Sequence, residues 1–261
     1  MKNIAVITDF GDSHYAGIIK GVISSIDENI KIIDITHHIS PQNIIEAAFI
    51  LKESMFYFKG DTVFLVVVDP SVGSKRRGIV VKYRDMYFVG PDNGVFEYVF
   101  KRGDYHLYEI IRPDFFTENI SNTFHGRDIF APLAAYIAAE KDTGDIIKEA
   151  QDPVRLSIPE PEIQEKTIIG GILYIDSFGN LITNIPADMI KDKRCSIKIK
   201  NRRLGRIRNT YSDVPVGFPV ALIGSSGMVE IAVHSGSAER WFNIKRDRIK
   251  NIKISINIHK R

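Results

Sequence analysis

Asp69 ends an uncharged apolar run and begins a turn that returns with three cations, in the stretch VVDPSVGSKRRG (67–78). A proline and a glycine favour a tight turn after Asp69, and Lys75 to Arg77 then bring three positive charges. The P-loop spacing G-x-x-x-x-G-K-[ST] is absent, and no G-x-G-x-x-G opens a helix. Two interpretations stay open, a structural Asp–Arg pair that braces the turn and a site that activates water.

Two further polar residues follow predicted strands or precede a predicted helix. Asp9, in TDFGD, comes after the first apolar run, so its carboxylate is expected at the same sheet edge as Asp69. It could accept hydroxyl hydrogen bonds, as from a ribose, or cap a helix. His125, in NTFHGRDIFAP, could join Asp69 and take a proton near neutral pH, or be structural. His37 and His38 are interpreted as structural.

The second half of the chain contributes two polar turns. IDSFGNLITNI (175–185) places an acid, a ring and an amide together, as Asp176, Phe178 and Asn180. IGSSGMVE (223–230) is a hydroxyl-rich turn that suits a carboxylate ligand. Turn formation explains either motif equally well, so neither assigns a function alone.

Alternating elements must position the first group of residues. Apolar runs predict strands over 3–8, 30–35 and 62–68 and a hairpin over 77–91. Helical spacing predicts helices over 15–26, from Ser40-Pro41 onward, over 92–100 and over 126–140. We therefore predict an N-terminal doubly wound α/β domain over residues 1–150.

A change of pattern marks a second domain. Residues 151–165 contain three prolines and little periodicity, which favours a linker. Beyond it, short runs of period two predict a smaller all-β, barrel-like domain over 166–261. Residues 1–165 carry 17 Lys and Arg against 25 Asp and Glu, net −8, and residues 166–261 carry 18 against 7, net +11. Such an asymmetry indicates two domains or two faces with different partners.

Composition narrows the class of protein. The 261 residues are 44% hydrophobic and 26% charged, and a single cysteine, Cys195, excludes an internal disulfide and a multi-cysteine zinc site. No apolar run approaches the ~20 residues of a membrane span, and the N-terminus lacks a signal-peptide pattern, so we expect a cytoplasmic protein without membrane contact. Nine cations against one acid over 191–208 would suit nucleic acid, but a solvated strand face is favoured and no nucleic-acid partner is expected.

Six ordered motifs between about residue 4 and residue 240 resemble one family: ITDFG with YAGIIKG, VVDPSVGSKRRGI, VGPDNG, TFHGRDIFAP, DSFGNLITNI and IGSSGMVEIAV. The chain is similar to the S-adenosyl-L-methionine hydrolases, also called SAM hydroxide adenosyltransferases, which are related to the SAM-dependent fluorinase and chlorinase. The resemblance implies an α/β domain, a barrel-like domain and a homotrimer with active sites between subunits. It implies no cofactor and no metal.

The resemblance also implies roles for particular residues. Asp69, Arg76 and His125 match the hydrolytic triad, and Asp9 matches the carboxylate that holds the ribose. Asp176 and Ser225 match the groups that hold the methionine end of the substrate, and the residues that match the nucleoside pocket are Phe178, Asn180 and Tyr211. The expected reaction is hydrolysis to adenosine and methionine by attack of water at C5′, in which Asp69 and His125 orient and deprotonate the water and Arg76 stabilises the hydroxide.

Several departures separate this chain from its relatives. Halogenases resemble YPATG at the turn where this chain has DPSVG, and they lack the histidine of FHGRD, so the chain resembles the hydrolase branch. Ser71 stands where glycine is usual, and His234 replaces the usual asparagine of EIAVN. Two other functions remain as alternatives: a metal-dependent nucleotidase or phosphatase that uses Asp and His ligands, and a non-enzymatic protein that binds adenosine or nucleic acid.

Overall fold

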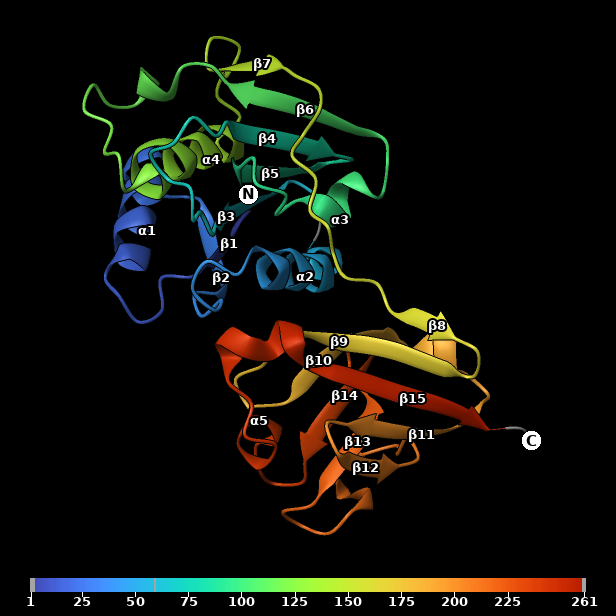
Figure 1. Cartoon of the computed structure of the whole chain (residues 1–261). Helices are drawn as coiled ribbons and strands as arrows, with labels where there is room; N and C mark the ends of the chain where they lie inside the picture. Colours follow the sequence, from blue (N-terminus) through green and yellow to red (C-terminus); the bar gives the residue numbers. More distant parts are fainter. Residues whose placement is uncertain (1–2, 59, 260–261) are drawn as a thin grey trace. The chain divides into compact units, whose positions relative to one another are not determined.

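The computed structural model describes residues 3–58 and 60–259, and the chain divides into two compact units. Unit 1 is Met1–Leu156 and unit 2 is Ser157–Arg261 (Figure 1). None of the helices in these described ranges is long and apolar enough to cross a membrane.

Unit 1 is built on a seven-stranded sheet in the order β2-β1-β3-β5-β4-β6-β7. The strands β2, β1, β3 and β5 run parallel, and β4, β6 and β7 continue the sheet in antiparallel pairs. Their bounds are β1 Asn3–Thr8, β2 Lys31–Thr36, β3 Thr62–Val67, β4 Gly78–Tyr83, β5 Met86–Pro91, β6 Tyr105–Ile110 and β7 Ile147–Glu149. The predicted hairpin is confirmed, because β4 and β5 pair around Arg84, whose φ is 55°.

Helices cover both faces of this sheet (Figure 1). Strand β3 contributes Leu65 to the core packed against α1 and α4, and Phe64 to the core packed against α2 and α3. Both faces of β3 are therefore buried, as its uncharged sequence predicts, and the doubly wound α/β prediction is confirmed. The helices are α1 Tyr15–Ile26, α2 Ile44–Ser54, α3 Glu97–Phe100 and α4 Ala131–Ala138, with a π-helix at Gly126–Phe130 and 3₁₀ turns at Met55–Tyr57 and Pro113–Phe115.

Two predicted helix starts are wrong. Ser40-Pro41 lies in a turn, and α2 begins at Ile44 after Asn43, whose side chain accepts a hydrogen bond from the Glu46 amide at 3.2 Å. Gln42 has a φ of 64°, which interrupts any helix that starts earlier. The predicted helix over 92–100 is reduced to α3, because Asp92 pairs with Arg77 instead of capping it.

The end of unit 1 is attached to α3 and to the loop before it. Arg155 Nε and Nη2 each donate to the Glu97 carboxylate at 2.8 Å, and the Leu156 amide also donates to this carboxylate at 3.1 Å. The Val154 amide donates to Asp92 at 2.8 Å. Part of the segment predicted as a linker, 151–165, is therefore bound to unit 1.

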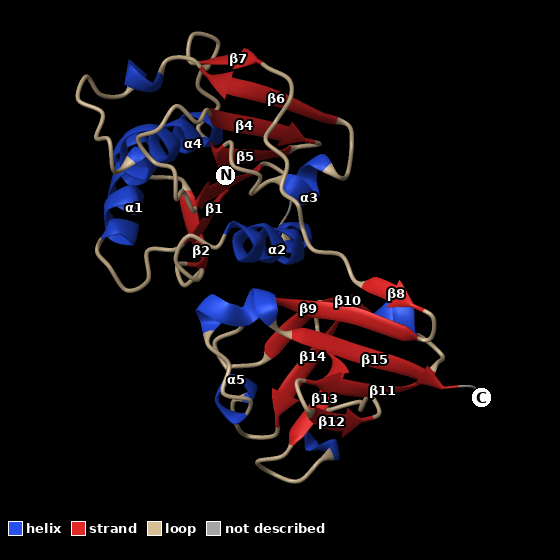
Figure 2. Ribbon diagram, in the orientation of Figure 1, coloured by secondary structure: helices blue, strands red, loops and turns tan. Residues whose placement is uncertain are grey.

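Unit 2 is an antiparallel sheet that curls into a nearly closed barrel (Figure 2), as predicted. The strand order is β12-β11-β15-β9-β10-β14-β13, and β8 pairs with β9. The bounds are β8 Glu162–Gln164, β9 Thr167–Ile175, β10 Leu181–Pro186, β11 Arg194–Ile199, β12 Arg202–Gly205, β13 Pro219–Ile223, β14 Met228–Val233 and β15 Lys253–His259, with α5 at Ala238–Trp241 and 3₁₀ turns at Ala187–Ile190, Tyr211–Asp213 and Arg246–Asn251.

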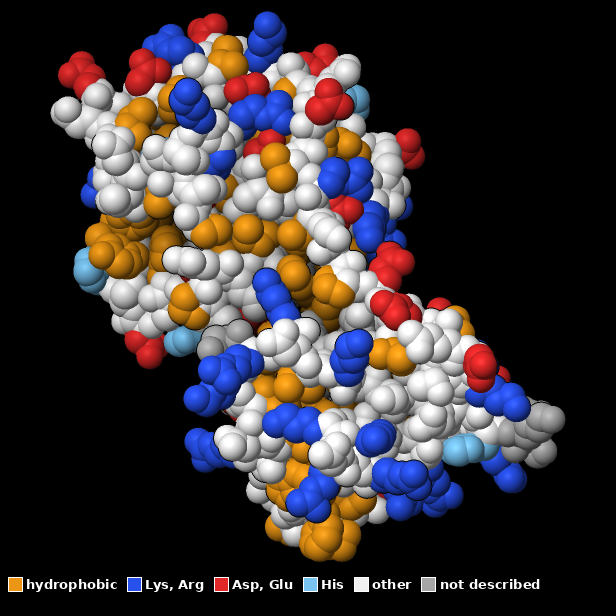
Figure 3. Space-filling model, viewed as in Figure 1, with side chains coloured by type: hydrophobic (Ala, Val, Ile, Leu, Met, Phe, Trp, Pro, Cys, Tyr) orange, Lys and Arg blue, Asp and Glu red, His pale blue; other side chains and the backbone are white. Residues whose placement is uncertain are grey.

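The basic segment of unit 2 is a half-exposed strand pair. Along β11, Cys195, Ile197 and Ile199 are buried, whereas Arg194 and Lys198 are exposed. This alternation confirms the predicted solvated face. Lys and Arg side chains are spread over the face of unit 2 that Figure 3 shows.

Candidate active site

Unit 1 brings Asp69, Arg76 and His125 into direct contact. Asp69 follows the carboxyl end of β3, Arg76 lies in the loop before β4, and His125 directly precedes the π-helix. Arg76 Nε lies 3.1 and 3.0 Å from the two Asp69 oxygens, and Arg76 Nη2 donates to Asp69 Oδ2 at 2.5 Å. The same Nη2 lies 2.7 Å from His125 Nδ1. The Asp69 and Arg76 side chains are only 5% and 9% exposed, so this is a buried ion pair.

The surrounding turn holds these groups in place. Gly73 has a φ of +78°, and a Cβ at this position would lie 2.3 Å from the Asn122 carbonyl oxygen. The turn therefore packs against the segment that leads to His125, which only glycine permits. Ser71, the departure from the usual glycine, lies with its hydroxyl 3.4 Å from Asp69 Oδ1.

The contact with Arg76 determines the protonation of His125. An arginine always donates, so His125 Nδ1 accepts and the neutral ring carries its hydrogen on Nε2. Burial lowers the pKa of His125, and the positive charge of Arg76 lowers it further, against the opposing effects of Asp69 and Asp128. The histidine is therefore neutral at pH 7 and presents an N–H donor.

Asp9 lies at the same edge of the sheet as predicted. Its Oδ2 accepts a hydrogen bond from the Gln42 amide at 2.9 Å. Burial raises the pKa of Asp9 despite this bond, and the negative charge of Asp69 adds to the increase. Rings of Phe10, Tyr15 and Phe124 pack edge to face beside it, with centroids 5.1 to 5.8 Å apart.

The sequence did not reveal the role of Asn93 or the partner of Arg77, the arginine next to Arg76. Asn93 Nδ2 donates to the Val68 carbonyl at 2.9 Å, which holds the residue directly before Asp69. Arg77 turns away from the triad and donates to the buried Asp92 at 2.7 Å. The motif VGPDNG contains Asn93 and also Asp92, the partner of Arg77, but it did not reveal these contacts.

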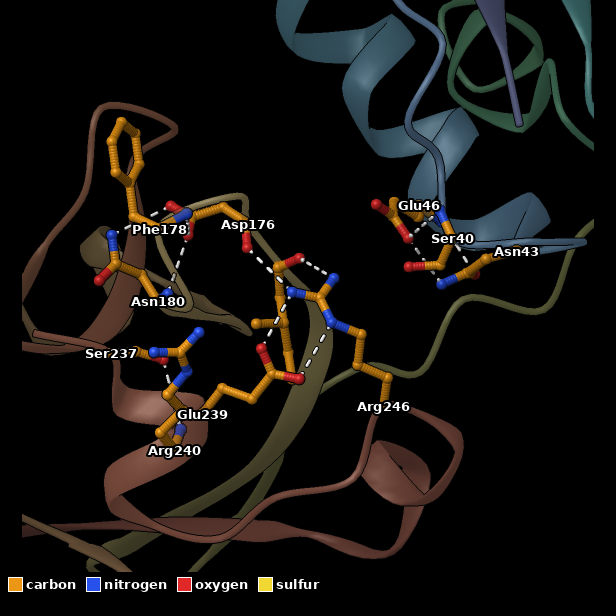
Figure 4. A network of polar contacts seen from close by, with 11 residues as sticks. Ser40, Asn43, Glu46, Asp176, Phe178, Asn180, Ser237, Glu239, Arg240 and Arg246 are labelled. Carbon is orange, nitrogen blue, oxygen red and sulfur yellow. Dashed lines mark hydrogen bonds and ion pairs between the residues drawn. The ribbon is translucent and has the colours of Figure 1, made fainter. Parts of the chain in front are cut away.

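In unit 2 the structure brings Asp176, Phe178 and Asn180 together in one turn. Asp176 Oδ1 accepts from the amides of Phe178 and Asn180 at 2.9 and 2.8 Å, and Oδ2 accepts from the Asn180 side chain at 3.0 Å (Figure 4). The Asp176 carboxylate thus organises its own turn, and the residue Phe178 is 78% exposed. A cavity of about 710 Å³ borders this turn.

Arg246 binds the backbone at the start of the same turn, a contact that the sequence did not indicate. It donates to the carbonyls of Ile175 and Asp176 at 3.0 and 3.2 Å. Its Nε and Nη2 also each donate to the Glu239 carboxylate at 3.0 Å (Figure 4). Glu239, Arg240 and Arg246 line the cavity together with Phe178, Asn180 and Tyr211. The only signal for Glu239 and Arg240 was the short helical turn predicted at SGSAERWF (235–242).

Tyr211 lines the cavity, whereas Ser225 is not among the described residues that line it. The Tyr211 hydroxyl donates to the buried Glu230 at 2.8 Å, and burial together with Glu230 raises the pKa of Tyr211 to about 12. Burial also raises the pKa of Glu230. Ser225 lies in the turn between β13 and β14.

His234 Nδ1 lies 2.7 Å from the Val214 carbonyl, so this ring holds the loop that follows Tyr211.

Within residues 3–58 and 60–259, no three His, Cys, Asp or Glu side chains are placed to hold one metal ion. Some Asp and His residues of unit 1 instead contact other partners, such as His38 with Asp12 and Asp69 with Arg76. Cys195 is a buried free thiol, and burial raises its pKa.

The fold and the site define a two-domain protein of a known kind. Residues 4–147 match the SAM hydroxide adenosyltransferase N-terminal domain, and residues 170–249 match the C-terminal domain. The chain therefore belongs to the SAM hydroxide adenosyltransferase family, which confirms the resemblance seen in its motifs.

Several relatives match over nearly full length. The (R)-S-adenosyl-L-methionine hydrolase of Thermus thermophilus is 32% identical over 94% of this chain and 97% of its own, and that of Methanocaldococcus jannaschii is 34% identical over 92% of each. The fluorinase of Actinopolyspora mzabensis is more distant, at 24% identity over 93% of this chain and 94% of its own. A crystal structure of an uncharacterized conserved protein from Thermotoga maritima aligns with a TM-score of 0.86 and 34% identity, over 98% of this chain and 100% of that one.

Proposed function

We propose that this protein hydrolyses S-adenosyl-L-methionine to adenosine and L-methionine, by attack of a water oxygen at C5′ and without a metal. The observation that carries the proposal is the Arg76 fork that joins Asp69 to His125 at the carboxyl end of β3. The near full-length similarity to (R)-S-adenosyl-L-methionine hydrolases supports the choice of substrate.

Each member of the triad has a separate task in this proposal. His125 Nδ1 is occupied by Arg76, so the ring donates its Nε2 hydrogen to the water oxygen and orients it. The Asp69 carboxylate takes the proton, and the Arg76 charge stabilises the developing hydroxide. This differs from the hypothesis drawn from the sequence, in which His125 also takes the proton.

The reaction balances without a general acid. The bond from oxygen to C5′ forms while the bond from C5′ to sulfur breaks, and sulfur keeps the electron pair. A sulfonium leaves as a neutral thioether, so methionine needs no proton, and the one from water is released. Positioning of the water in line with the breaking bond can lower the activation barrier of such reactions by ~7–11 kcal/mol.

The remaining residues bind the substrate in this proposal. Asp9 accepts hydrogen bonds from the ribose hydroxyls. Phe178, Asn180 and Tyr211 form the adenine pocket, and their position around one cavity supports this role. Asp176 and Ser225 hold the methionine end. The protein is proposed to be a cytoplasmic homotrimer whose sites combine one subunit's unit 1 with the next subunit's unit 2, which the opposite net charges of the two halves favour.

The test is incubation of the full chain with substrate in ¹⁸O water and excess EDTA, followed by mass spectrometry. Adenosine labelled at its 5′ oxygen, released together with methionine, is the expected result. Asp69→Asn should abolish the label, and Asp12→Asn, whose side chain is 97% exposed, should leave it unchanged. Product that forms only without EDTA would support a metal enzyme, and tight adenosine binding without product would indicate a nucleoside-binding protein.

A further inference from the structure

We propose that His37 is a positioning residue for substrate binding, because its ring holds Thr8, directly before Asp9, and its carbonyl holds Gly11, two residues after it. The inference rests on the proposed function, in which Asp9 binds the ribose hydroxyls. It gives a buried polar residue next to the site a task beyond the structural role expected from the sequence.

His37 contacts the residue directly before Asp9 and the residue two positions after it. Its Nδ1 lies 2.9 Å from the hydroxyl of Thr8, a fully buried residue at the end of β1. Its carbonyl oxygen accepts a hydrogen bond from the Gly11 amide at 2.7 Å. Gly11 has a φ of 60° and lies directly after Asp9 and Phe10, so this bond ties the backbone after Asp9 to the segment that follows β2. The His37 backbone thus holds the chain after Asp9, and the His37 side chain holds the residue before it.

The hydrogen bonds form a chain with a consistent direction. The Phe10 amide donates to the Thr8 hydroxyl at 3.3 Å, so this hydroxyl is free to donate to His37 Nδ1. The ring then carries its hydrogen on Nε2, which lies 3.2 Å from Asp34 Oδ1. Lys20 of α1 holds the other Asp34 oxygen at 2.5 Å. The Asp34 carboxylate, paired with Lys20, therefore lies beside the ring nitrogen that carries this hydrogen.

The same segment also contacts Asp9 itself. The Gln42 amide donates to Asp9 Oδ2 at 2.9 Å, and the Ile39 amide donates to the Thr8 carbonyl at 3.3 Å. Residues 37–42 therefore wrap around the turn that carries Asp9. The side chain of His37 is the buried connection between this segment and the Thr8 hydroxyl, since only 12% of it is exposed.

His38 provides a matched control one residue away. Its side chain is 65% exposed, and its Nε2 lies 3.5 Å from the exposed Asp12 carboxylate. Replacement of His38 removes the same kind of side chain from the same segment, but it leaves every contact to Thr8, Asp9 and Gly11 in place.

The experiment compares two ligands by titration calorimetry with the full chain. Adenosine carries the ribose hydroxyls, and 2′,3′-dideoxyadenosine lacks them. His37→Ala should weaken adenosine binding about tenfold, as the loss of one buried hydrogen bond does, and leave dideoxyadenosine binding unchanged. His38→Ala should change neither. His37→Asn, which keeps a hydrogen-bonding group near Thr8, should restore part of the loss.

The outcomes separate the inference from the proposed function. If wild-type protein prefers adenosine but His37→Ala weakens both ligands equally, or neither, the positioning role is wrong and the ribose site stands. If wild-type protein binds both ligands equally, the ribose role of Asp9 fails and the inference falls with it. Should His37→Ala not fold, Thr8→Val removes the same hydrogen bond from the other side and must show the same selective loss.

Discussion

Replacement of Arg76 by methionine should leave the Asp69 carboxylate buried without its counter-charge. The wild-type pair has three close contacts between the guanidinium and the carboxylate, and the two side chains are 5% and 9% exposed. Removal of one partner from a buried ion pair costs about 3–5 kcal/mol, because the remaining charge is uncompensated. We therefore expect Arg76→Met to lower the free energy of unfolding by that amount.

A second substitution should recover most of this loss. Asp69→Asn in the Arg76→Met background removes the isolated charge, so the double variant should be more stable than Arg76→Met alone. The assay is urea unfolding followed by circular dichroism, on the wild type, both single variants and the double variant. All three variants should be inactive, which separates the effect on stability from the effect on turnover.

Arg112→Met is the matched control, since its partner Asp114 lies at the surface and both side chains are more than half exposed. It should leave the unfolding curve unchanged. A change below about 1 kcal/mol for Arg76→Met, or single-variant effects that simply add in the double variant, would refute the reasoning that the pair is buried and coupled.

Three further predictions follow from the sites. The pKa of His125 is lower in the folded protein than in the unfolded chain, so as pH falls the unfolded chain takes up the imidazole proton first, and the folded protein should lose stability as pH falls through 6.5. His125→Asn should remove this loss from a plot of melting temperature against pH. Identical plots for the variant and the wild type would contradict the prediction. Gly73→Ala should destabilise the protein by about 1–3 kcal/mol in urea unfolding, because Cβ meets the Asn122 carbonyl at a φ of +78°; an unchanged midpoint would show that the turn can move. Tyr211→Phe should cost about 1–3 kcal/mol in the same assay by leaving Glu230 buried without its donor, and a stability equal to wild type would mean that water replaces the hydroxyl.

Much of unit 1 was predictable because its strands carry their own signal. The uncharged stretch over 62–68 is buried on both sides, and parallel strands place Asp9 and Asp69 at one edge. The helix start at Ser40-Pro41 was not predictable in this way. Three polar residues compete there, and the choice of Asn43 as the cap depends on Gln42, whose positive φ places its amide on Asp9.

The candidate site was predictable as a set of residues but not as a set of contacts. The motif DPSVGSKRRG offers two adjacent arginines, and only the fold shows that Arg76 bridges to His125 while Arg77 pairs with Asp92. The protonated nitrogen of His125 depends on that bridge, across 49 residues of sequence. Arg246 escaped prediction for the same reason, since its support of the Asp176 turn spans 70 residues.

The π-helix after His125 has a consequence for how this part of the chain can change in length. The Ala131 amide donates to the Gly126 carbonyl, five residues back, so Gly126–Phe130 holds one residue more per turn than an α-helix. Deletion of one residue here would restore the ordinary pitch, and since a π-helical turn with one extra residue covers about the same rotation as an α-helical turn, His125 would keep its direction relative to the buried face of α4. A one-residue gap within 126–130 of an aligned relative is therefore compatible with a histidine in the same position, whereas a gap within α4 itself would rotate the residues before it by about 100°.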